Sequence, residues 1–82
     1  YVVEKSDNVL LIAFDIPEKK KKFRHWLRLT IKKMGLKMIQ RSVWLGKIRL
    51  PGEFIEDLKI LKLLDYFEIL SVSKSGSLKR LI

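Results

Sequence analysis

The sequence contains no cysteine and a single histidine, His25, among its 82 residues. Disulfides, thiol nucleophiles, cysteine zinc sites and iron–sulfur clusters are therefore excluded, and one histidine cannot form a two-histidine metal site within one chain. The four glycines form neither a dinucleotide-binding fingerprint nor a P-loop, so nucleotide cofactors have no support. These absences remove most enzyme classes and leave carboxylates, hydroxyls and basic side chains as candidate functional groups.

Long apolar segments are missing as well. The longest purely apolar run, Val9 to Phe14, is far shorter than the ~20 residues that span a bilayer, and no cleavable signal pattern opens the chain. We therefore expect a cytoplasmic protein without membrane contact. Its length predicts one domain over residues 1–82, and because the first residue is tyrosine rather than methionine, we expect that domain to be excised from a longer chain.

Acidic residues are absent between Glu18 and Glu53, although the sequence holds 18 lysines and arginines against nine acids. Twelve of the positive charges lie in this stretch. Such a block creates a strong positive potential, and its commonest partner is a phosphate backbone. We expect a nucleic acid as partner, DNA rather than RNA, with a solvated face that only aids solubility as the alternative.

The first half of the chain predicts a strand and then a helix. Asn8 to Phe14 is continuously apolar, as in a strand buried on both faces, and Pro17 with Glu18 favours a helix start. The helix should end at Gly35, after cations that suit its negative end. One face of this helix is apolar and another is basic. Together with the following turn, the basic face supplies the predicted nucleic-acid-binding residues: Lys20, Arg24, Arg28, Lys32 and Arg41.

The second half predicts a hairpin, a helix and a last strand. Leu36 to Ile48 alternates around a polar centre at residues 40–42, which indicates two strands meeting at a turn. After Pro51 and Gly52, apolar residues recur at helical spacing behind an acidic first turn. Phe67 to Ser73 predicts a strand, followed by a turn over residues 74–77 and a tail over residues 78–82.

The resulting order, β-α-β-β-α-β, predicts an α+β fold of the ferredoxin-like kind: a four-stranded antiparallel sheet with both helices on one face. The first strand is nevertheless apolar on both faces, so something must cover the other face. A second copy of the domain would do so through a twofold interface, and we expect a homodimer. The tail over residues 78–82 is a candidate for exchange onto the partner's sheet edge.

Asp15 is the candidate catalytic and metal-binding residue. It is a lone carboxylate directly after the apolar strand, beside a helix start and the basic block. Carboxylate oxygen is a ligand that Mg²⁺ or Mn²⁺ prefers, but one carboxylate needs a second Asp15 across a dimer, or substrate phosphates, to complete a site. The alternative is that Asp15 accepts hydrogen bonds from the first helical N–H groups.

Three other side chains are candidates for chemistry, but a structural role is the better interpretation of each. His25 lies off the apolar stripe and is expected at the surface or its boundary. Ser42 is expected to stabilise its own turn rather than bind phosphate. Trp44 is expected in the core or an interface rather than stacked on a base.

Two segments carry a resemblance to a known family when taken together. Leu10 to Glu18 contains the aspartate-isoleucine-proline motif, and residues 40–44 form a glutamine-basic-serine-valine-aromatic motif. With Phe23-Arg24, Leu27-Arg28 and Gly35-Leu36, they resemble the small CRISPR-associated adaptation proteins of the Cas2 family. They are also similar to the middle domain of the phenylacetate-catabolon repressors (PaaX), and the match covers about Val9 to Lys74.

The two branches of this resemblance imply different functions. The adaptation branch implies a homodimer that bridges integrase subunits and holds DNA, in some members with metal-dependent nuclease activity at the aspartate that corresponds to Asp15. The repressor branch implies a dimerising, effector-responsive core beneath an N-terminal winged helix. We predict an adaptation-type nucleic-acid-binding protein, either a scaffold or a metal-dependent endonuclease, with a non-catalytic regulatory core as the alternative.

Overall fold

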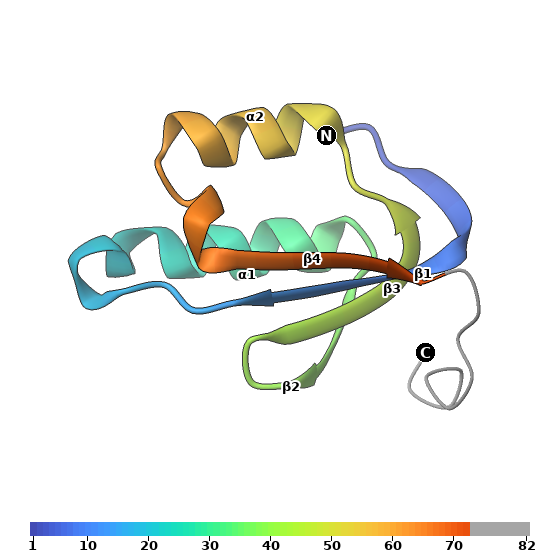
Figure 1. The fold of residues 1–82 in the computed structure, drawn as a ribbon, viewed down its shortest axis with the longest axis horizontal. Helices are drawn as coiled ribbons and strands as arrows, with labels where there is room; N and C mark the ends of the chain where they lie inside the picture. The colour runs from blue at the N-terminus through green and yellow to red at the C-terminus, as the bar shows by residue number, and fades with distance from the viewer. Residues whose placement is uncertain (73–82) are drawn as a thin grey trace.

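The computed structural model describes residues 1–72, and these residues form one antiparallel sheet with two α-helices and two short 3-10 helices (Figure 1). The strands are β1 (Glu4–Phe14), β2 (Lys37–Gln40), β3 (Val43–Arg49) and β4 (Phe67–Val72). The helices are η1 (Glu18–Phe23), α1 (Arg24–Lys33), α2 (Gly52–Ile60) and η2 (Leu64–Tyr66). The sheet order β2-β3-β1-β4 confirms the predicted ferredoxin-like α+β fold.

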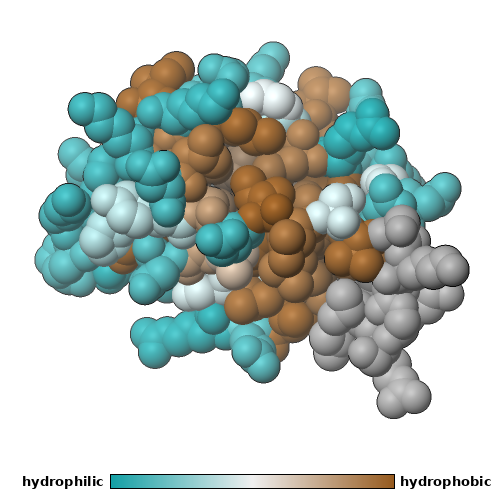
Figure 2. All heavy atoms as spheres, in the orientation of Figure 1, coloured by the Kyte–Doolittle hydropathy of each residue, from teal (hydrophilic) through white to brown (hydrophobic). Residues whose placement is uncertain are grey.

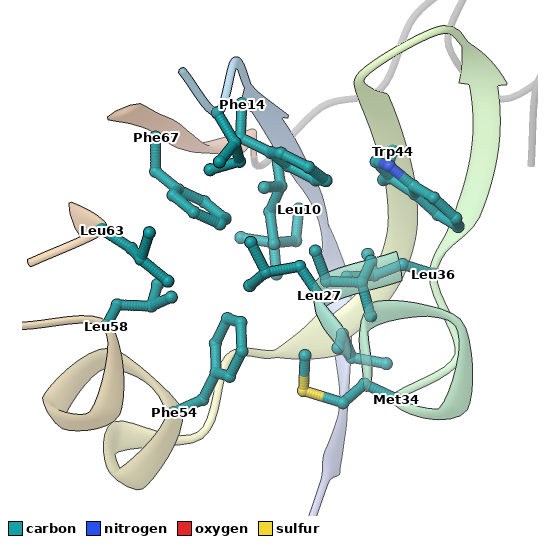
Figure 3. Close-up of a cluster of buried hydrophobic side chains, with 14 residues drawn as sticks. Leu10, Phe14, Leu27, Met34, Leu36, Trp44, Phe54, Leu58, Leu63 and Phe67 are labelled. Carbon is teal, nitrogen blue, oxygen red and sulfur yellow. The ribbon is translucent and has the colours of Figure 1, made fainter. Parts of the chain in front are cut away.

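The first strand is central, as its apolar sequence predicts, because it pairs with β3 on one side and β4 on the other. Alternation along β1 sends Leu10, Ile12 and Phe14 to one face of the sheet. Both helices cover this face: the buried core joins those three side chains to residues of α1 and of α2. Figure 3 shows this cluster, with Phe54 of α2 and Leu27 of α1 pointing toward the strands.

The predicted helix from Pro17 to Gly35 is wrong in its first third. Residues 18–23 form η1, with a kink at Lys20 (φ −118°, ψ 18°), and α1 begins only at Arg24. Two physical reasons account for this: Pro17 offers no side-chain cap, and four consecutive lysines follow Glu18 and repel one another. The continuous basic face expected from Lys20 to Lys32 is therefore broken between Lys20 and Arg24.

The remaining elements occur in the predicted order, although some of their bounds differ from the prediction. Gly35 ends the helix in a left-handed conformation (φ +99°), and the N–H of Leu36 donates to the carbonyl of Ile31 over 3.3 Å. The hairpin turns at residues 41–42, where Ser42 has φ +71°. The predicted strand at Asn8 is longer than expected, since β1 begins at Glu4, in a polar stretch whose pairing with β3 is irregular before Leu10.

The face of the sheet away from the helices carries a row of three leucines. Leu11 of β1 lies opposite Leu45 of β3 and opposite Leu70 of β4. Leu45 has no exposed surface, whereas Leu70 is 56% exposed. Figure 2 shows hydrophobic surface over the middle of the molecule, where Figure 1 places β4. Within residues 1–72 both α-helices pack on the opposite face, so this row has no helix over it.

The first residues of the chain pack on α2. The ring of Tyr1 meets that of Phe54 edge to face, with centroids 5.4 Å apart, and its hydroxyl donates to the Asp57 carboxylate. Partial desolvation, this hydrogen bond and the charges of Asp57 and Glu53 raise the pKa of Tyr1 to about 12. The start of the described chain is thereby held against the helical layer.

Several expectations fall outside the described residues: the end of the last strand at Ser73, the turn over 74–77 and the tail over 78–82. Within residues 1–72 the longest α-helix has ten residues, and none is long and apolar enough to cross a membrane.

Candidate functional site

A hollow of about 480 Å³ opens where β1 ends. Three parts of the chain meet there: the end of β1, the first turns of α1 and the turn between β2 and β3. The lining residues are Phe14, Asp15, Ile16, Arg24, Arg28, Arg41 and Ser42. The hollow therefore contains Asp15 and three of the five predicted nucleic-acid-binding residues.

Backbone hydrogen bonds hold the end of β1 in place at the hollow. The N–H of Asp15 donates to the carbonyl of Tyr66 over 3.1 Å, and the N–H of Phe14 donates to the carbonyl of Ser42 over 3.0 Å. The first bond ties β1 to the segment before β4, and the second ties it to the hairpin turn. Asp15 is exposed, so its carboxylate faces solvent from a fixed backbone.

Arg24 is the one arginine of the hollow with partners among residues 1–72. Its guanidinium donates to the carbonyl of Ile16 over 2.8 Å and to the carboxylate of Glu18 over 3.2 Å. The first contact bridges the start of α1 to the segment that leaves β1. The second is a surface ion pair, which on its own stabilises little. Arg24 therefore has a structural role in shaping the hollow.

Arg28 and Arg41 are exposed and approach the hollow from different elements. Arg28 lies one helical turn after Arg24, on the same face of α1. Arg41 lies in the turn between β2 and β3, next to Ser42. Within residues 1–72 neither arginine forms an ion pair, and neither does Asp15. The hollow thus brings together charged groups that do not neutralise one another by direct contact.

This donor set does not fit a divalent cation held by one copy of the chain. Among residues 1–72, Asp15 is the only carboxylate that lines the hollow, and it shares the space with three guanidinium groups. Residues 1–72 contain no cluster of three aspartate, glutamate or histidine side chains. Guanidinium charge repels a cation, and Mg²⁺ or Mn²⁺ usually needs more oxygen ligands. The assignment of Asp15 as a catalytic metal ligand stays a prediction.

The other two predicted nucleic-acid-binding residues do not line the hollow. Lys20 is half-buried in η1, and its Nζ donates to the carbonyl of Leu61 over 3.0 Å, just after the end of α2. This bond links η1 to the second helix. Lys32 is exposed on α1, beyond the part of the helix that reaches the hollow. Of the five predicted nucleic-acid-binding residues, three therefore line the hollow and two, Lys20 and Lys32, lie outside it.

Three side chains with structural expectations occupy the predicted places. His25 is exposed, and Trp44 is buried in the core. Ser42 stands in a turn, as expected, but it also lines the hollow, which the sequence-based interpretation missed. Its position depends on the pairing of the hairpin with β1. The signal that could have found it is its adjacency to Arg41 in the predicted turn.

Fold and hollow together define the class of this protein: a ferredoxin-like domain whose central strand ends at an arginine-lined depression. Comparison with protein-family models then places the chain more closely. A model described as the central Cas2-like domain of PaaX proteins matches residues 6–80, and the chain belongs to this family. The searches of curated proteins and of solved structures gave no match. Family membership agrees with the resemblance noted in the sequence.

Proposed function

We propose that this domain is the dimerising, ligand-responsive core of a PaaX-type transcriptional regulator. This was the alternative in the sequence analysis, and the family match now makes it the better supported of the two functions. The resemblance implies that such a core transmits a signal to an N-terminal DNA-binding segment. It needs a dimer interface and a ligand site, but no catalysis.

The observation that carries the proposal is the leucine row on the sheet face away from the helices. Leu11, Leu45 and Leu70 run across three neighbouring strands, and Leu70 is more than half exposed. An exposed leucine at the end of an otherwise apolar row favours an interface: fully burying a leucine side chain contributes about 1.5–3 kcal/mol, and about half of this remains available at Leu70, which is 56% exposed. In a twofold interface each such residue contributes twice.

The test is the mass of the chain in solution, measured by light scattering at micromolar concentration. We expect twice the chain mass for the parent protein and the single chain mass for Leu70→Glu. Because the twofold axis places two charges in one interface, dimer affinity should fall at least about a hundredfold. Ile60→Glu is the matched control: Ile60 is 74% exposed on α2, in the helical layer, and its substitution should leave the dimer intact.

Two results would contradict the proposal. If the parent chain stays monomeric across the micromolar range, the leucine row does not form a dimer interface. A Leu70→Glu variant that still dimerises places the interface elsewhere. Circular dichroism of both variants checks that each is folded.

Nucleic-acid binding by the domain itself is the second candidate function. It is favoured by Arg28, Arg41 and Lys32, which are exposed and form no ion pair within residues 1–72. If they contact phosphates, affinity for duplex DNA should fall steeply with salt, with a log–log slope near −0.9 per neutralised phosphate. Arg28→Ala and Lys32→Ala should weaken binding and flatten the slope. Lys59→Ala, on the acidic helix α2, should change neither.

The adaptation-type role adds two further expectations to this second candidate. It predicts an integrase subunit as partner and metal-dependent cleavage that Asp15→Asn abolishes. Cleavage by the parent chain with Mg²⁺ or Mn²⁺, lost in Asp15→Asn while the variant still dimerises, would favour that role. Binding without cleavage would leave a scaffold or a regulator.

A further inference from the structure

We propose that the hollow at the end of β1 binds a small phosphate monoester, and not a divalent cation. The proposal deepens the proposed function, because it names the ligand class of a ligand-responsive core. It rests on the charge of the lining, on the directions from which the arginines approach and on the concave shape of the site.

The charge of the lining suits an anion. Arg28 and Arg41 contribute two positive charges that form no ion pair within residues 1–72, whereas Arg24 is paired with Glu18; with Asp15 included, the net charge at the hollow is about +1. A phosphate monoester carries about −1.5 to −2 at pH 7, whereas a phosphodiester carries one negative charge. A cation would face a net repulsion in the same space.

The arginines can reach one ligand from two sides. Arg28 projects from α1, and Arg41 belongs to the turn between β2 and β3 on another part of the rim. Each guanidinium offers parallel N–H donors that match two oxygens of a phosphate group. Arg24 is oriented by its hydrogen bond to the Ile16 carbonyl, and the remaining N–H groups of its guanidinium add to the positive potential of the hollow. Arg28 and Arg41 are therefore the residues expected to hold the phosphate.

The shape favours a small molecule over a nucleic-acid backbone. Ligand sites for small molecules are concave and commonly have volumes of about 300–1,000 Å³, and this hollow is about 480 Å³. A duplex presents its phosphates along a convex surface, and single phosphates of that surface would enter such a site poorly. The phosphate is expected to be terminal, with the rest of the ligand extending out of the hollow.

Asp15 adds selectivity to the site. Its carboxylate accepts hydrogen bonds and repels phosphate oxygens, so it favours a ligand with a hydroxyl or amide donor next to the phosphate. A bare phosphate ion lacks such a donor and retains the repulsion. Replacing Asp15 by asparagine should therefore strengthen the binding of inorganic phosphate, which is opposite in sign to the effect expected at a metal site.

The experiment is a calorimetric titration of the 82-residue chain with inorganic phosphate and with ribose 5-phosphate, in a buffer free of other oxyanions. We expect saturable binding of both, tighter for the sugar phosphate. Arg28→Gln and Arg41→Gln should each weaken binding about tenfold. Asp15→Asn should bind inorganic phosphate about threefold more tightly. Arg49→Gln, an exposed arginine on β3 outside the hollow, is the matched control and should bind as the parent does.

Several results would overturn the proposal. The first is the absence of saturable phosphate binding. The second is a loss of phosphate affinity in Arg49→Gln as large as that in Arg28→Gln and Arg41→Gln. The third is Mn²⁺ binding by the parent chain that Asp15→Asn abolishes. Dimethyl phosphate binding as tightly as ribose 5-phosphate would assign the hollow to phosphodiesters instead. The proposed function can fail separately: a monomeric parent chain that still binds phosphate overturns the dimerising core but not the anion site.

Discussion

The Arg24 side chain stabilises the fold beside the hollow, whereas Arg28 is available to a ligand. A measurement of stability should separate these two roles. The perturbation is Arg24→Met, which keeps a long unbranched stem but removes every guanidinium donor. Ile16, whose carbonyl accepts from Arg24, is buried in the core beside the end of β1. Without the guanidinium this carbonyl loses its bond to the first residue of α1.

The magnitude follows from the two contacts. A hydrogen bond from a charged donor contributes about 1.5–3 kcal/mol, and because the Arg24 side chain is 36% exposed we take the lower end of that range. The ion pair with Glu18 adds at most a few tenths, since the Glu18 side chain is 74% exposed. Arg24→Met should therefore lower the free energy of unfolding by about 2 kcal/mol, or the Tm by about 10 °C.

The assay is urea denaturation of three variants. Arg28→Met is the matched control, because Arg28 lies one turn later and has no hydrogen-bond or ion-pair partner among residues 1–72; its change should stay within about 0.5 kcal/mol. Glu18→Gln should lose only the few tenths assigned to the ion pair. If Arg24→Met costs no more than Arg28→Met, the bond to the Ile16 carbonyl does not contribute as argued.

Three further predictions concern the helical layer and the hairpin. Phe54→Ala should lower the free energy of unfolding by about 3–5 kcal/mol in urea, since this fully buried ring joins α2 to the core; a loss below about 1 kcal/mol would contradict its packing. Tyr1 should ionise near pH 12 in a spectrophotometric titration, and Asp57→Asn should lower that pKa. Because the folded pKa lies above the ordinary value of 10.0, the stability that Tyr1 contributes should be complete below pH 10 and lost between pH 10 and about 12; an unchanged pKa in the variant would contradict the contact. Gly46→Ala should cost about 1–3 kcal/mol, because a Cβ would lie 2.9 Å from Leu36 Cδ2 and 3.2 Å from a backbone oxygen; a neutral substitution would show that the hairpin adjusts freely.

The order of the elements could be predicted because each has a clear apolar pattern: β1 contains a continuous apolar run, the hairpin alternates around a polar turn, and both α-helices have apolar residues at helical spacing. The start of α1 could not, because Pro17 and Glu18 favour a helix locally while the lysines that follow oppose it. The structure resolves this competition with η1 and a kink at Lys20. The first residues of β1 were missed because their polar sequence does not alternate clearly.

The candidate site could be predicted residue by residue but not as a unit. Asp15 was distinguished by its place after an apolar strand, and Arg24, Arg28 and Arg41 by the acid-free stretch. That the hairpin turn meets the end of β1 depends on the antiparallel register, in which the N–H of Phe14 reaches the Ser42 carbonyl. The bond from Lys20 to the Leu61 carbonyl joins residues 41 positions apart, and no local pattern indicates it.

A ¹H–¹⁵N NMR titration of the chain reports directly on whether the end of β1 is an anion site. With inorganic phosphate, we expect the largest shift changes to cluster at residues 14–16, 24–28 and 41–42. A parallel titration with Mn²⁺ should leave Asp15 no more broadened than other exposed acidic residues. Phosphate shifts spread evenly over all lysines and arginines, or selective broadening of Asp15 by Mn²⁺, would contradict an anion site at the end of β1.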